Sequence, residues 1–348
     1  MVAKPIITFK PKPVVKKLLS VLVPRGRDVM ISRYGLSDEG KKLTLESIGK
    51  KYGITRERVR QIENYSLDHV RKSKEYKEAT SIFKELQTVM DDMGGIIEEG
   101  DFLRAMGNDN STRNHIHFLL VIGEQFTKHK EDDDFRNRWH IDPALASKIH
   151  DSLKKVYGGL SDNDLIAEKD FIASFLDELK EVAEKYKKDE IIKRWLSLSK
   201  KIGSNPLGEW GKVDSPNINA RGMRDYAFLV IRKHGSPIHF RDVADSITKV
   251  FNKKAHVATT HNELIKDPRF VLVGRGLYAL AEWGYMSGVV RDVIKKVIEK
   301  NGPLTRQEVI DKVLKERYVK ENTIVVNLQN PKFFKKDEVG KYHLANQK

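Results

Sequence analysis

The stretch LTLESIGKKYGITRERVRQIENYSLDHVRK, residues 43–72, decides the fold of the N-terminal part of the chain. Thr44 and Thr55 are placed as N-caps, because a threonine oxygen can accept hydrogen bonds from the first exposed amides of a helix. Gly53 suits the left-handed position of the turn between them. The spacing therefore predicts two short helices joined by a tight turn, which is a helix-turn-helix.

One side of this pair is predicted to be apolar. Gly49 allows the two helices to cross closely. The residues expected in the inward cluster are Leu45, Ile48, Ile54, Val59 and Ile62. The rest of the second helix is then free to face outward.

The outward side of the second helix carries side chains suited to reading DNA bases. Arg56 and Arg60 form one row at i,i+4 spacing, and Glu57 and Gln61 form the adjacent row. Arginine can bridge guanine, glutamate can accept from cytosine and glutamine can pair with adenine, each worth about 1–3 kcal/mol of discrimination. Base readout is the favoured interpretation, and a helix that contacts protein is the alternative.

Other cations near this helix are expected to contact phosphates, which set register but not sequence. The predicted DNA-binding residues are Thr55, Arg56, Glu57, Arg58, Arg60, Gln61, Arg71 and Lys72, of which Arg58, Arg71 and Lys72 are the predicted phosphate contacts.

Residues 25–73 resemble region 4 of the primary bacterial sigma factors, and TRERVRQIE is highly typical of that family. The resemblance implies that this domain reads the upstream promoter hexamer in the major groove and grips the flap of the RNA polymerase β subunit. It also implies roles for single residues: base contacts by Arg56, Glu57 and Gln61, and backbone support by Arg58 and Arg60. One departure is Tyr65, where a basic residue is common in the family.

A second departure concerns the length of the chain before the match. Only about 24 residues precede it, so the aromatic-rich domain that melts promoter DNA in a sigma factor is not expected. We therefore predict that the chain alone does not open promoters.

Composition limits the remaining possibilities. The 348 residues carry a net charge of +15 and contain no cysteine, which excludes disulfides, thiolate zinc sites, iron–sulfur clusters and cysteine nucleophiles. Residues 1–80 carry 19 Lys+Arg against 9 Asp+Glu (+10), 81–200 carry 18 against 24 (−6), and 201–348 carry 27 against 16 (+11). Basic ends favour a polyanionic partner, most often nucleic acid. Solvated charged faces are the alternative.

No stretch resembles a membrane span or a secretory signal, so we expect a soluble protein of the cytoplasm that associates with the nucleoid and not with a membrane.

The pattern predicts a mainly α chain of serial helix-turn-helix and winged-helix domains with small β-hairpin wings. The predicted parts are a flexible basic arm (1–20), the helix-turn-helix (21–78), a winged-helix-like domain (80–142), a helical connector (143–200), a linker (201–220) and two related winged helices (221–285 and 286–348). These last two form an internal repeat, because GLYAL at 276–280 is matched by GKYHL at 340–344 and DPRF at 267–270 by NPKF at 330–333.

Residues 221–285 are similar to the HARE-type helix-turn-helix of the RNA polymerase delta subunit and of chromatin- and restriction-associated proteins, which implies binding to DNA or polymerase.

Two candidate metal sites are weak. His115, His117, His129 and His140 fit no compact site, and the acidic run at 131–134 lacks the lysine and further carboxylate of a magnesium nuclease. No phosphate loop, zinc-protease or serine-hydrolase motif is present. We therefore predict no catalytic residue, no metal and no cofactor.

The leading hypothesis is a sequence-specific transcription factor that binds double-stranded promoter DNA and contacts RNA polymerase. The alternatives are a delta-like polymerase accessory protein that binds protein instead of DNA, and a metal-dependent nuclease or restriction component.

Overall fold

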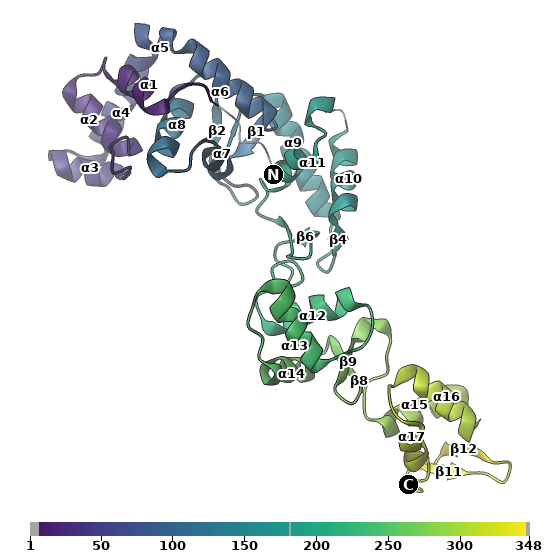
Figure 1. Ribbon diagram of the computed structural model, residues 1–348. Coiled ribbons are helices and arrows are strands. Elements are labelled where there is room, and N and C mark those ends of the chain that lie inside the picture. Colours follow the sequence, from purple (N-terminus) through teal and green to yellow (C-terminus); the bar gives the residue numbers. More distant parts are fainter. Residues whose placement is uncertain (1–6, 181, 346–348) are drawn as a thin grey trace. The chain divides into compact units, whose positions relative to one another are not determined.

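The computed structural model describes residues 7–180 and 182–345 of the chain (Figure 1). It is mainly helical, with small three-stranded sheets, so the predicted fold class is confirmed. The chain divides into two compact units, one of residues 1–203 and 210–213 and the other of 204–209 and 214–348. Within the described ranges, no helix has the length and apolar character needed to cross a bilayer.

The helix-turn-helix forms as the sequence predicts. It consists of α2 (Pro24–Tyr34), α3 (Leu45–Tyr52) and α4 (Arg56–Arg71). The Thr44 hydroxyl accepts from the Ser47 amide (3.1 Å), and the Thr55 hydroxyl accepts from the Arg58 amide (3.2 Å). Gly53 has a φ of 65°. The five predicted apolar residues pack together with Val29.

The prediction of a flexible basic arm over residues 1–20 is wrong for α1 (Pro11–Leu19). Val15, Leu18 and Leu19 are buried, since their i, i+3 and i+4 spacing puts them on one side of a helix. Pro11 is tolerated because its missing N–H would have no partner in a first turn. Residues 1–6 of the predicted arm lie outside the described residues.

The first winged helix shares its hydrophobic core with the helix-turn-helix. After α5 (Lys74–Glu78) come its elements: α6 (Thr80–Asp92), β1 (Ile96–Glu98), α7 (Glu99–Met106), α8 (Asn110–Ile122), β2 (Thr127–His129) and β3 (Arg138–His140). The strands are ordered β1-β3-β2. One buried cluster runs from α1 through α6 and α8 to Trp139. The Asn114 amide on α8 also donates to the carbonyls of Gly35 (3.0 Å) and Gly40 (2.8 Å). These contacts join the two domains into one body.

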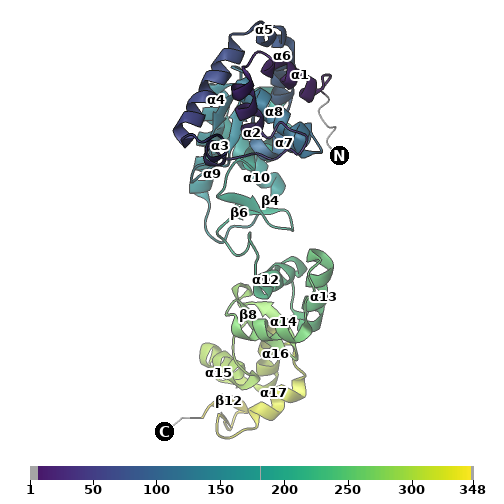
Figure 2. The ribbon, with the colours of Figure 1, turned by 90° about the vertical axis from the view of Figure 1, so that its left-hand side faces the viewer.

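The predicted helical connector (143–200) and the first part of the predicted linker form a second winged helix, so the predictions are wrong there, while residues 213–220 hold no helix or strand, as expected of a linker. The elements of the second winged helix are α9 (Pro143–Gly159), β4 (Ile166–Ala167), α10 (Glu168–Leu179), η1 (Glu184–Tyr186), α11 (Asp189–Leu196), β5 (Ile202–Ser204) and β6 (Glu209–Lys212). Strands β4 and β6 lie side by side (Figure 2). The glycines that suggest a linker belong to the β5–β6 hairpin, where Gly208 has a φ of 82°. Trp210 on β6 is buried and stacks on Phe171, with ring centroids 5.4 Å apart.

The C-terminal repeat consists of the third and fourth winged helices. The third has α12 (Met223–His234), β7 (Ile238–His239), α13 (Phe240–Phe251), α14 (Val257–Lys266), β8 (Phe270–Gly274) and β9 (Leu277–Leu280), followed by η2 (Ala281–Trp283). The fourth has α15 (Val290–Asn301), β10 (Leu304–Thr305), α16 (Arg306–Glu316), α17 (Glu321–Leu328), β11 (Phe334–Lys336) and β12 (Lys341–Leu344). Phe270 pairs with Leu280 as Phe334 pairs with Leu344, so Phe334 and not Phe333 is the structural counterpart of Phe270.

All four winged helices follow one plan. In each, the last strand in sequence lies at the centre of the sheet. An aromatic residue occupies that central strand in every copy: Trp139, Trp210, Tyr278 and Tyr342. Within residues 7–180 and 182–345, the chain therefore carries four serial copies of one fold behind the helix-turn-helix.

Because α1 belongs to the shared core, Leu18→Ala should lower the free energy of unfolding of the first unit by about 2–5 kcal/mol. Amide hydrogen exchange should speed up in α4 and α8 together and stay unchanged in α12–α17. Lys16→Ala, an exposed position on the same helix, is the control and should change little. An unaltered exchange pattern in Leu18→Ala would mean that α1 is dispensable for this core.

Candidate nucleic-acid interface

Helix α4 has one side buried in the first unit and one side free. Its buried residues are Val59, Glu63, Ser66 and Val70, whose spacing of three and four residues marks a single inner stripe. On the other side, Arg56, Glu57, Arg60, Gln61 and Asn64 are all exposed. Since a rigid helix cannot turn its inner stripe out of the core, the orientation of this polar row is determined.

The buried carboxylate of Glu63 holds α4 in this rotation. It accepts a hydrogen bond from the Tyr34 hydroxyl (2.9 Å) and lies 3.4 Å from the Arg33 guanidinium. Burial and the neighbouring carboxylate raise the pKa of Tyr34, so the phenol stays protonated and donates. These partners on α2 compensate the cost of a buried charge.

Two pairs of side chains order the exposed row. The Arg60 guanidinium binds the Glu57 carboxylate through two hydrogen bonds of 2.9 and 2.6 Å. This hydrogen bond and the charge of Arg60 lower the pKa of Glu57, while Glu57 raises that of Arg60. Arg58 donates to the Gln61 side chain at 3.0 Å. Both pairs are exposed to solvent, so exchanging them for contacts to bases or phosphates costs little.

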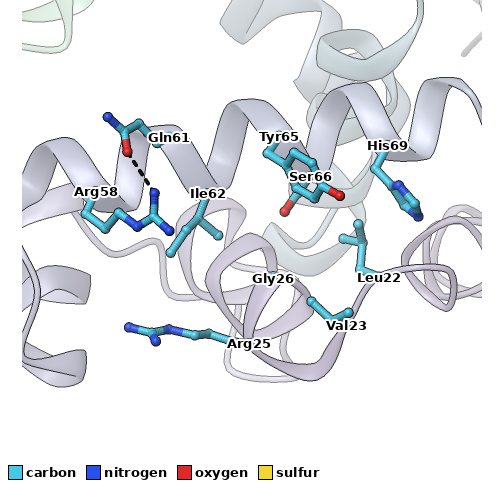
Figure 3. Close-up of a pocket in the computed structure, with 10 residues that line it drawn as sticks. All are labelled: Leu22, Val23, Arg25, Gly26, Arg58, Gln61, Ile62, Tyr65, Ser66 and His69. Atoms are coloured by element: carbon cyan, nitrogen blue, oxygen red, sulfur yellow. Dashed lines mark hydrogen bonds between the residues drawn. The ribbon is translucent and has the colours of Figure 1, made fainter.

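A groove of about 550 Å³ runs beside the row, between α4 and the start of α2 (Figure 3). Val23 and Tyr65 are each 68% exposed along it, while Arg25 and Arg58 are cations on its wall. Tyr65 stacks on His69 one turn further along α4, with ring centroids 6.0 Å apart. The groove thus combines apolar surface with positive charge.

Arg71, predicted as a phosphate contact, is used inside the protein. Its guanidinium donates to the carbonyls of Ile122 (3.1 Å) and Val121 (2.9 Å), which end α8. It therefore caps α8 and joins α4 to the first winged helix. The sequence around Arg71 does not indicate this capping role, because the end of α8 lies about 50 residues further along the chain. Lys72, in contrast, is exposed.

Two residues of this surface were missed by sequence reasoning. Asn64 continues the row one turn beyond Arg60. Its i+4 spacing from Arg60 would have been enough to predict it from the sequence. Arg25 comes from the first turn of α2 and faces the groove with Arg58. No local pattern links Arg25 to α4, because only the packing of α2 brings them together.

The four histidines considered as metal ligands do not gather at one site, because they contact different partners. His115 Nδ1 lies 2.7 Å from the Ser111 carbonyl oxygen, His117 lies against Glu99, and His129 Nε2 lies 2.9 Å from His140 Nε2. The acidic run at 131–134 forms ion pairs with Lys200 and Lys201 (2.9 and 2.6 Å) and with Arg138 (3.1 Å). In the part of the chain that the structure describes, no three such side chains are grouped to hold a metal ion.

Comparison with known proteins bears on the same segment. Residues 18–72 match the family model described as "Sigma-70, region 4". The chain is 48% identical over 68 residues to RNA polymerase sigma factor SigA1 of Synechococcus elongatus, a match covering 20% of this chain and 16% of that protein. It is 52% identical over 56 residues to sigma factor SigA of Nostoc sp., covering 16% and 14% of the two chains. It is 44% identical over 55 residues to the principal sigma factor HrdD of Streptomyces coelicolor, covering 16% of each.

Each of these matches covers a small part of both chains, and the family model matches α2, α3, α4 and the last two residues of α1. The chain therefore spans only about a sixth of the length of these relatives. The likeness concerns this segment alone and leaves the four winged helices to be interpreted from their own structure.

Because Arg71 caps α8, Arg71→Ala should lower the free energy of unfolding by about 1–3 kcal/mol, the cost of leaving buried carbonyls without a donor. The slope of log affinity for DNA against log salt concentration should stay unchanged. Lys72→Ala is the matched variant, with unchanged stability and a salt slope reduced by about 1 if it meets a phosphate. Unfolding curves measure the stability of both variants, and DNA-binding titrations at several salt concentrations measure the slope. A reduced slope for Arg71→Ala would contradict the assignment of Arg71 to the α8 cap.

Proposed function

We propose that this protein is a sequence-specific double-stranded DNA-binding protein that reads promoter-type sequences with α4 and works together with RNA polymerase. The observation that carries the proposal is the uncovered polar row of α4, on a segment that matches sigma-70 region 4. Arg56 and Gln61 are the proposed principal base contacts, with Glu57 and Arg60 released from each other when DNA is bound.

The electrostatics support a duplex as the partner. Residues 1–80 carry a net charge of +10 whereas residues 81–200 carry −6, so the positive charge of the first unit is concentrated in the segment that contains α4. Arg58 and Lys72, with Arg25 across the groove, can meet phosphates on the two sides of the reading helix. Such contacts release counterions, so affinity should fall steeply with salt.

The contact with RNA polymerase is proposed from the sigma-factor likeness together with the free surface of the first unit. The inner side of α4 is covered by the core that it shares with α1 and α8, so a polymerase subunit must use another face. Only the part of the groove formed by the exposed Val23 and Tyr65, and not the part formed by Arg25, Arg58 and Gln61, is the apolar surface next to α4 that suits a protein partner (Figure 3).

That same groove favours the second candidate function, an accessory protein that binds polymerase and not DNA. The two candidates differ in a simple measurement. An accessory protein would co-purify with polymerase after nuclease treatment and have no measurable affinity for duplexes. A promoter-reading protein would enrich a defined sequence from random duplex DNA.

The double variant Arg56→Ala with Gln61→Ala should bind the enriched sequence about 30-fold more weakly or worse, since each lost base pairing costs about 1–3 kcal/mol. Its affinity for random duplexes should change far less. Arg104→Ala, which removes an exposed arginine on α7, is the control and should bind as the unmodified protein does. Mobility shifts with both DNAs test this. Equal affinity of the double variant and the unmodified protein for the enriched sequence would rule out α4 as the reading helix.

A further inference from the structure

Each winged helix has three helices, and the third of them is α8, α11, α14 or α17. These third helices fall into two groups by what covers them. In the first winged helix, α8 is covered by α1, and Phe118 and Leu119 are fully buried. In the second, Trp195 on α11 donates to the Gly94 carbonyl (3.0 Å) and Arg194 lies 3.5 Å from Asp101. Both third helices therefore serve packing inside the first unit.

In the third and fourth winged helices, the third helix has only one buried side. Helix α14 packs on α12 and α13 through Thr260 and Leu264. Helix α17 packs on α15 and α16 through Ile324, Val325 and Leu328. Their opposite sides are open to solvent even where they carry large apolar residues, since Ile265 is 62% and Val326 is 58% exposed.

The exposed rows of these two helices share an unusual chemistry. At i, i+4 and i+7 spacing, α14 presents Ala258, Asn262 and Ile265. The positions 64 residues later, on α17 and at its C-cap, are Asn322, Val326 and Gln329, and they are exposed too. Both rows combine a side-chain amide with aliphatic groups and carry no charge. Glu321 lies at the start of α17, outside the row.

Cations surround both rows. Lys253 and Lys254 precede α14 and Lys266 ends it, while Lys320 and Lys332 flank α17. The wing of the third winged helix ends in Arg275, exposed between two glycines, and Gly276 there has a φ of 71°. Among the described residues, Arg275 has no hydrogen bond or ion pair. Uncharged rows between basic flanks match a duplex, whose phosphates are negative and whose groove is lined by polar bases.

We propose that α14 and α17 are two major-groove helices that read A·T base pairs. An asparagine or glutamine amide pairs with adenine N6 and N7, and aliphatic side chains contact the thymine methyl group. Neither row offers arginine for guanine or a carboxylate for cytosine. Arg275 at the wing tip suits the narrow minor groove of A·T-rich DNA. This inference goes beyond the function of α4 because it gives the second unit its own DNA specificity.

The test uses the full-length chain carrying Arg56→Ala with Gln61→Ala, so that sequence reading by α4 does not contribute. Binding to two duplexes of equal length, one of mixed A·T and one of mixed G·C pairs, is measured by fluorescence anisotropy at one salt concentration. The A·T duplex should bind at least about 10-fold more tightly. Adding Asn262→Ala and Asn322→Ala should remove most of that preference, and Arg275→Ala should reduce it.

Asn219→Ala, which removes an exposed amide that belongs to neither helix, is the matched control and should retain the preference. Thermal unfolding of each variant shows whether an exposed substitution has left the fold intact. Equal binding to both duplexes, or a preference unaffected by the two asparagine substitutions, would overturn the proposal. So would loss of polymerase co-purification in the asparagine variants without any change in DNA binding, because the rows would then be protein contacts. None of these results depends on whether α4 reads promoters.

Discussion

The packing of the inner stripe of α4 is the constraint on which the N-terminal unit depends. Val59 and Val70 are fully buried, and the buried Glu63 carboxylate is held by Tyr34 and Arg33. A charge left without these partners would cost several kcal/mol, so α4 cannot rotate about its axis. The polar row on the other side is thus aimed by the core. Arg71 extends the same constraint to α8, which fixes α4 to the first winged helix.

Repetition of one small fold explains how the rest of the chain is built. A winged helix buries the inner faces of three helices against a short sheet. The outer face of its third helix can either pack on other parts of the protein or stay exposed to solvent. In the first unit the third helices are covered by α1 or contact Gly94 and Asp101 of the first winged helix, so they stabilise this unit. In the second unit they stay in solvent with amide and aliphatic side chains. The same topology thus has a packing role in the first unit and, in our proposal, a recognition role in the second.

Local signals were sufficient for the helix-turn-helix. N-cap threonines, a left-handed glycine and an apolar stripe act within a few residues, and each was found in the predicted place. The second winged helix escaped prediction because β4 has only two residues and β5 three, too short for a strand period to be visible. The prediction of a flexible basic arm fails at α1 for a related reason. The stripe of Val15, Leu18 and Leu19 is short, and its burial depends on α8, far along the chain.

The amino-acid sequence by itself determined the helix-turn-helix, the residues on the outer row of α4, the basic ends and the existence of a C-terminal repeat, because these depend on side-chain identity and short-range spacing. Only the tertiary structure decided which surfaces remain available. Packing assigned Arg71 to a helix cap, buried α1 and α8, and left α14 and α17 open, since burial is a property of residues distant in sequence that meet in space.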